Sequence, residues 1–101
     1  MTKQIERIKL MEQHLDRASQ AVMQLSAALD DYTAAQKAIS ELSAYYGSKD
    51  WKQDFADDEQ GLLPNDLKRG VLSEDAIWNL LSDCNELNSR MQELLTANKH
   101  L

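Results

Sequence analysis

The chain has 101 residues, of which 43% are hydrophobic and 28% charged, and its formal net charge is −6. This length allows one domain with a modest core, so association with another chain is a reasonable expectation. The negative charge argues against a nucleic-acid partner, because nucleic-acid binders use clustered Lys and Arg to displace counterions from phosphates. Ala, Leu, Gln, Glu and Lys are abundant and β-branched residues are scarce, which favours an all-α fold.

The N-terminal part of the chain shows no targeting or membrane-spanning pattern. Charged and apolar residues alternate through the first thirty positions, which excludes both a signal-peptide segment and a membrane span there. The single cysteine, Cys84, cannot form an internal disulfide and gives no metal-ligand spacing. We therefore expect a cytoplasmic protein that does not bind membranes, with Cys84 as a buried apolar thiol.

Residues 2–46 contain neither Gly nor Pro and are expected to form one long helix. Apolar residues in its first half follow the 3 and 4 spacing of a narrow coiled-coil face. We call this face the N-terminal stripe, and it consists of Ile5, Ile8, Met11, Leu15, Ala18 and Val22. A second series begins one short step out of phase and consists of Leu25, Ala28, Tyr32, Ala35, Ile39, Leu42 and Tyr46.

The next stretch, residues 47–72, interrupts the pattern and includes all three glycines and the only proline. Gly47 is suited to end the first helix, and Ser48 is a good N-cap for a short helix expected over residues 49–58. Pro64 is placed to open a further helical turn over residues 64–69. This stretch is therefore expected to form the corner of a helical hairpin.

A last helix is expected over residues 74–98, with Ser73 as its N-cap and Leu72 packed on Ile77. The first helix would be about 67 Å long and the last about 38 Å. Folded back antiparallel, the last helix would leave the N-terminal stripe without an internal partner. Such a stripe is an interaction site by default.

Two architectures fit these elements. The first is a long antiparallel hairpin completed by homodimerisation, in which two N-terminal stripes pair in a four-helix arrangement. The second is a monomeric three-helix bundle, in which the first run breaks near Asp30 and an Asp caps a new helix. In both, residues 1–101 form a single all-α domain.

The corner carries a family resemblance. From residue 45 the sequence reads YYGSKDWKQDFADDEQGLLPNDLKRGVLSED. It resembles the pattern YYxSxxWxxD, an acidic stretch and LPxDLKRGVLSED, which marks a family of small bacterial helical proteins classed as a domain of unknown function. The similarity covers about residues 8–95. It implies a helical protein and supplies no activity or functional residues.

Chemically interesting side chains gather in and beside the corner. This candidate corner site consists of Tyr46, Trp51, Asp54, Phe55, Lys68, Arg69, Asp75 and Trp78. Its aromatic rings are expected to fill the corner, and its cations to pair with nearby acids. Acidic oxygens suit hard cations, but Glu59 falls where an EF-hand loop starting at Asp54 requires glycine.

No nucleophile elbow, zinc spacing or phosphate-binding glycine loop appears, so we expect no catalytic residue, no metal ligand set and no cofactor. The sequence favours a non-enzymatic protein–protein interaction module that self-associates through its N-terminal helix and could also bind an unidentified protein. The alternative function is a ligand or divalent-ion sensor that uses the acidic corner.

Overall fold

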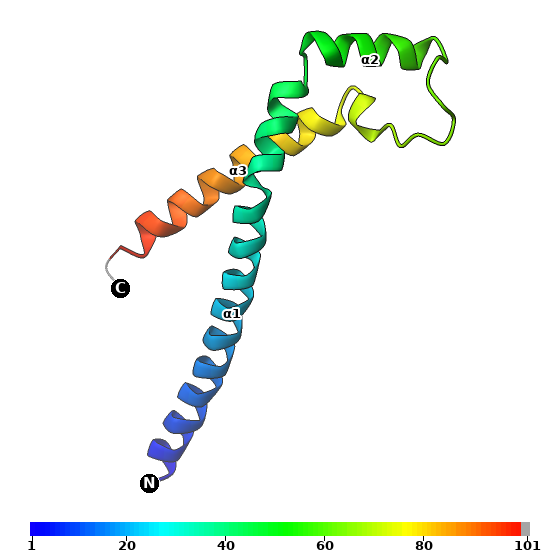
Figure 1. The fold of residues 1–101 in the computed structure, drawn as a ribbon. Coiled ribbons are helices and arrows are strands. Elements are labelled where there is room, and N and C mark those ends of the chain that lie inside the picture. The colour runs from blue at the N-terminus through cyan, green and yellow to red at the C-terminus, as the bar shows by residue number, and fades with distance from the viewer. Residues whose placement is uncertain (100–101) are drawn as a thin grey trace. The chain divides into compact units, whose positions relative to one another are not determined.

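The computed structural model describes residues 1–99, and within them all regular structure is helical (Figure 1). The elements in chain order are α1 (Thr2–Tyr45), α2 (Lys49–Glu59), the 3₁₀ helix η1 (Gly70–Leu72) and α3 (Ala76–Ala97). The all-α fold class with a long N-terminal helix is therefore confirmed.

The first helix, α1, is continuous through Asp30, so the alternative with a break at that position is wrong. A helix loses its hydrogen-bond ladder most readily at Pro, and none occurs in α1. Contacts nevertheless divide the chain into two compact units, Met1–Gln36 and the chain from Lys37 onward. The first unit is helical from Thr2 to its end and has no second element.

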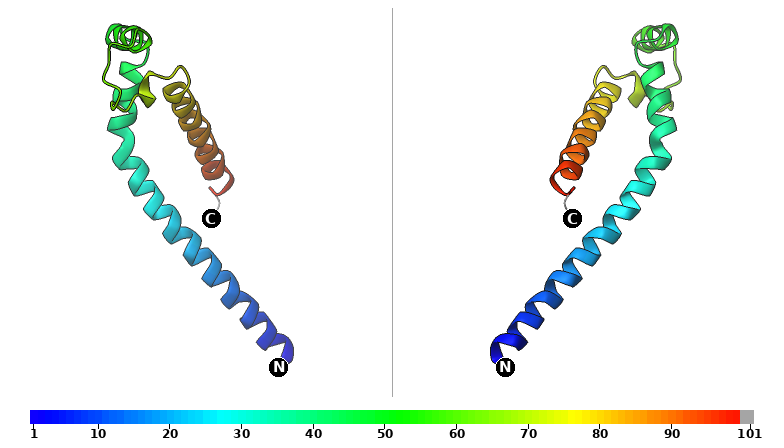
Figure 2. Two further views of the ribbon diagram at one scale, coloured as in Figure 1. Left: turned by 90° about the vertical axis from the view of Figure 1, so that its right-hand side faces the viewer. Right: turned by 90° about the vertical axis from the view of Figure 1, so that its left-hand side faces the viewer.

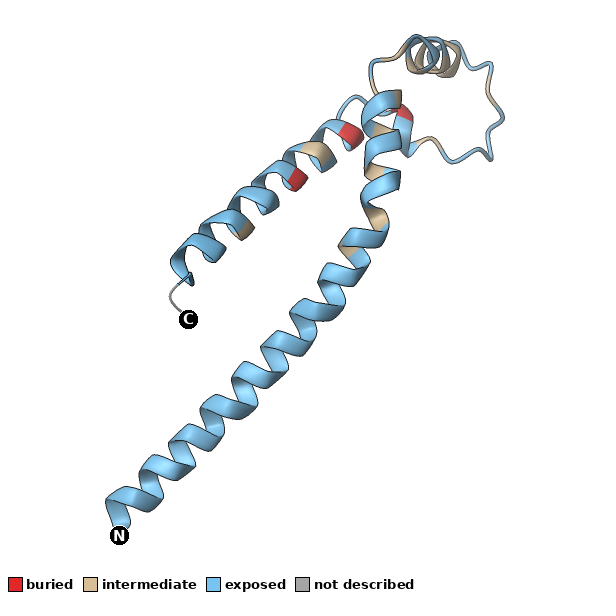
Figure 3. Cartoon of the chain, turned by 60° about the vertical axis from the view of Figure 1, so that its left-hand side comes forward, coloured by how far each residue is buried: buried red, intermediate tan, exposed pale blue. Residues whose placement is uncertain are grey.

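Burial along α1 separates the two apolar series. Every residue from 1 to 31 is exposed, including the whole N-terminal stripe (Figure 3). The second series becomes half-buried from Tyr32 on, at Tyr32, Ala35, Ile39 and Leu42. Burial thus begins at Tyr32, about one helical turn after Ala28, where the second series has changed phase.

The junction between α1 and α2 is a sharp turn at Gly47. Its φ of +77° is a left-handed conformation that glycine adopts without a Cβ clash. Ser48 follows, and its side chain accepts a hydrogen bond of 3.1 Å from the Trp51 backbone N–H. This bond satisfies one of the free donors in the first turn of α2.

The helix expected over residues 64–69 is not formed, and that prediction is wrong. A single turn stands there, closed by a bond of 3.2 Å from the Leu67 N–H to the Pro64 carbonyl. One hydrogen bond does not offset the conformational entropy of a helix nucleus, and the stretch has no room for a second turn. The next regular element is η1, which begins at Gly70.

The start of α3 is held by Ser73. Its hydroxyl accepts from the Ala76 N–H at 3.1 Å and donates to the Gly70 carbonyl at 2.9 Å, so it links α3 to η1. The helix is regular from Ala76, and Asp75 before it makes no side-chain capping bond. Leu72 and Ile77 flank this link and are 6% and 2% exposed, which places the core of the second unit here.

Gly47→Ala is expected to lower the free energy of unfolding by about 1 kcal/mol, because alanine is strained at the positive φ. Gly70→Ala is the matched control, since its φ is not left-handed and a Cβ there meets no atom within 4 Å. Urea unfolding followed by tryptophan fluorescence measures both. Equal losses would contradict this account of the turn.

Ser73→Ala removes two hydrogen bonds at the joint between η1 and α3. We expect it to lower the free energy of unfolding by about 1–2 kcal/mol, in the range of lost N-caps. Ser82→Ala, within the exposed face of α3, serves as the control and should be neutral or slightly stabilising. A melt in which both variants behave alike would show that Ser73 is not a cap.

Candidate functional site

Three aromatic side chains of the candidate corner site form a contiguous group, which we call the aromatic cluster. Trp51 and Phe55 are one helical turn apart on α2 and stack with ring centroids 5.2 Å apart and an interplanar angle of 25°. Tyr46, from the turn before α2, meets Trp51 edge-on at 5.2 Å and 68°. Both are favourable ring geometries, so the expected filling of the corner is found in these three residues.

The aromatic cluster is also tied to the segment around η1. Trp51 Nε1 donates a hydrogen bond of 2.9 Å to the Val71 carbonyl. The Tyr46 hydroxyl donates to the Glu74 carbonyl at 3.1 Å, across 28 positions of sequence. Two ring donors thus satisfy two backbone acceptors of the segment that leads into α3. Figure 2 shows this segment and α2 from two further sides.

A second polar pair joins the end of α1 to α2. The Tyr45 hydroxyl donates to Asp54 Oδ2 at 2.6 Å. This hydrogen bond to Asp54, together with burial and the negative charges of Asp54 and Asp50, raises the pKa of Tyr45 to about 12. Ionisation of the phenol would place a second negative charge beside a carboxylate, which explains the direction of the shift.

A further polar contact anchors the irregular link between α2 and η1, residues 60–69, to the end of α2. Arg69 Nη1 pairs with Asp58 Oδ1 at 2.7 Å, and both side chains are partly buried. The sequence indicates such pairing for Lys68 and Arg69, and the structure assigns it to Arg69. A partly buried ion pair with a short hydrogen bond contributes more than a fully exposed pair.

The remaining predicted site residues do not join this group. Trp78 is 59% exposed on α3 and takes part in neither ring contact of the aromatic cluster. Asp75 is exposed at the start of α3. The sequence-based site also omits Tyr45 and Asp58, whose partners become visible only once α2 is folded against its neighbours.

The acids of the corner do not converge on a point. Among residues 1–99, no three His, Cys, Asp or Glu side chains are grouped closely enough to hold a metal ion. Asp54 and Asp58 each accept from the partner described above, and Asp57 accepts from Gln53 Nε2 at 2.9 Å. Within the described part of the chain, no helix has the length and apolarity needed to cross a membrane.

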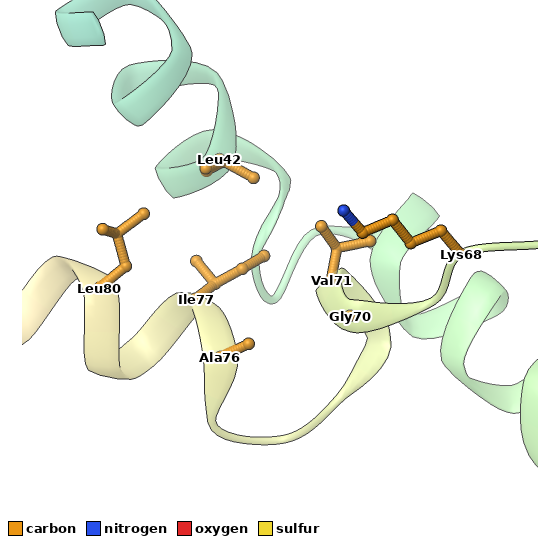
Figure 4. A pocket seen from close by; sticks show the side chains of 7 residues that line it. All are labelled: Leu42, Lys68, Gly70, Val71, Ala76, Ile77 and Leu80. Atoms are coloured by element: carbon orange, nitrogen blue, oxygen red, sulfur yellow. The ribbon is translucent and has the colours of Figure 1, made fainter. Parts of the chain in front are cut away.

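Beside this network lies a surface hollow of about 380 Å³, which we call the corner hollow (Figure 4). It is lined by Leu42 of α1, Lys68, Gly70 and Val71 before and within η1, and Ala76, Ile77 and Leu80 of α3. Only Lys68 of these belongs to the sequence-based site. The signal for the others is apolar spacing, since Leu42 belongs to the second series of α1 and the apolar residues Ile77 and Leu80 lie three positions apart on α3.

The hydrogen bond between Tyr45 and Asp54 makes the free energy of unfolding fall as the pH rises in the alkaline range. Its contribution is complete below pH 10, the ordinary tyrosine pKa, and is lost as the pH rises toward the folded value of about 12. Asp54→Asn should lower the pKa of Tyr45 toward 10 and flatten this dependence. Absorbance of tyrosinate against pH measures the pKa, and urea unfolding measures the stability.

Asp57→Asn is the control, because it removes the same charge from α2 without touching Tyr45. Tyr45→Phe assigns the titration, since the tyrosinate absorbance step with a pKa of about 12 should be absent in that variant. An unchanged alkaline step in Asp54→Asn would show that the carboxylate is not its cause.

Comparison with known proteins adds one finding. No curated protein and no solved structure matches this chain. A family model does match, over residues 8–94, and its description is Domain of unknown function (DUF4298). Because the match includes the N-terminal stripe from Ile8 on, the second apolar series, the corner and nearly all of α3, the chain belongs to the DUF4298 family.

Proposed function

We propose that this protein is a non-enzymatic protein–protein interaction module that self-associates through the N-terminal stripe. The observation that carries the proposal is the exposure of this stripe along a regular helix. Leu15 and Val22, for example, are 59% and 67% exposed. Full burial of one such side chain is worth about 1.5–3 kcal/mol, so a partner that covers the stripe gains a substantial free energy.

The first unit also needs such a partner for its own stability. Isolated helices are marginal in water, and most helical stability in proteins comes from packing an apolar face. In residues 1–31 no side chain is even half-buried. A spacing of 3 and 4 that is kept over six apolar positions is the pattern that packs as a coiled coil.

The charges beside the stripe favour a second copy as the partner. With Ile8 and Leu15 at the first position of successive heptads, Arg7 and Glu12 fall at the two flanking positions. In a parallel pair in register, Arg7 of each copy faces Glu12 of the other. The complementary charge is thus present within one chain, as a two-fold symmetric interface requires.

The chemistry of the second unit supports the non-enzymatic part of the proposal. Cys84 is a buried free thiol on the packed face of α3, where it acts as a small apolar side chain. Tyr45, Tyr46 and Arg69 of the corner are each engaged with another side chain or with the backbone. A lone reduced thiol also supports a cytoplasmic location.

Leu15→Lys places a charge in the middle of the stripe and is expected to convert a dimer into a monomer, because a charge buried without a partner is strongly unfavourable. Light scattering coupled to size-exclusion chromatography measures the mass over a range of concentrations. The wild-type chain should have twice the mass of one chain and the variant the mass of one.

Gln20→Lys is the matched control, since it adds the same charge on the opposite face of α1 and should leave the dimer intact. Both tryptophans lie in the second unit, so their fluorescence reports whether that unit stays folded in each variant. A wild-type chain that is monomeric at every concentration tested would overturn the proposal.

A further inference from the structure

We propose that the corner hollow binds a small molecule that has an apolar body and one carboxylate. The corner hollow lies entirely within the second unit, so this binding is independent of the N-terminal stripe and of dimerisation. Its volume of about 380 Å³ is within the range of small-molecule sites. It is distinct from the aromatic cluster, none of whose rings lines it.

The apolar body is indicated by the walls. Leu42, Ile77 and Leu80 supply aliphatic side chains from α1 and α3, and Val71 closes the side formed by η1 (Figure 4). Gly70 adds open space, because a Cβ built there meets no atom within 4 Å. An aliphatic or aromatic group placed here would displace water from these walls, which is favourable in proportion to the apolar area covered.

The carboxylate is indicated by Lys68. Its side chain lines the corner hollow, and Figure 4 shows it on the same side as Val71. Among residues 1–99 one ion pair is formed, and it joins Arg69 to Asp58, so no carboxylate of these residues neutralises Lys68. Beside apolar walls, a cation that has no carboxylate partner among these residues favours an anion over a cation or a neutral molecule.

The backbone of η1 and the side chain of Ile77 are held in place before any ligand arrives. The Val71 carbonyl is fixed by Trp51 Nε1 at 2.9 Å, and the Gly70 carbonyl by the Ser73 hydroxyl at 2.9 Å. Ile77 is 2% exposed and therefore cannot swing away. A site whose walls are already ordered loses little conformational entropy on binding.

The test is a titration of the full chain with octanoate, octanol and octylamine in turn. NMR chemical shifts of the backbone amides locate the binding site, and calorimetry measures the affinity. We expect saturable shifts at Val71, Ala76 and Ile77, with octanoate bound more tightly than octanol and octylamine weakest. Lys68→Gln should weaken octanoate about fivefold, the scale of a partly exposed ion pair, and leave octanol unchanged. Lys52→Gln, on the exposed surface of α2 away from the corner hollow, is the control for charge and should change neither.

A second pair of variants tests the walls. Leu80→Gln places an amide in the corner hollow and should weaken octanoate and octanol alike, whereas Leu87→Gln, one heptad further along α3 and outside the lining, should not. Tryptophan fluorescence checks that each variant is folded. The proposal is overturned if shifts at the lining residues do not saturate at millimolar octanoate. It is also overturned if octanoate and octanol have equal affinities for the wild-type chain and equal affinities for the Lys68→Gln variant.

Discussion

The hydrogen bond from Trp51 Nε1 to the Val71 carbonyl is the contact on which the second unit depends. Its donor is the central ring of the aromatic cluster, and its acceptor belongs to η1. The link between α2 and η1 has no regular structure to hold its two ends together, so this bond and the ion pair of Arg69 with Asp58 fix them. Once η1 is fixed, Leu72 is buried and Ser73 is placed to start α3.

The helices and their ends could be predicted because they depend on local chemistry. Gly47 and Ser48 act within three residues of their positions, and the helical form of both apolar series follows from their spacing. The polar pairs could not be predicted in the same way. Whether Lys68 or Arg69 meets Asp58 depends on the path of the link between Gly61 and Gly70. Which tyrosine meets Asp54 depends on how the turn at Gly47 orients α2, and no periodicity describes either.

Two predictions about the corner differ from the structure, each for its own physical reason. A helix over residues 64–69 fits local propensity, but so short a segment needs tertiary contacts to offset the cost of nucleation, and Leu67 is exposed. The aromatic ring of Trp78 is expected to fill the corner, yet Trp78 lies on the exposed face of α3 while Ile77 takes the buried one. Neighbouring helix positions differ by about 100° in direction, so residue type alone does not decide burial.

The two halves of α1 show what an apolar period can and cannot establish. Both keep the same spacing, and only the half from Tyr32 on is partly covered within the described chain. Periodicity therefore predicts that a face is to be covered and leaves open which surface covers it. For the N-terminal stripe, the partner proposed above is a second copy, which would present the same apolar spacing together with charges complementary to Arg7 and Glu12.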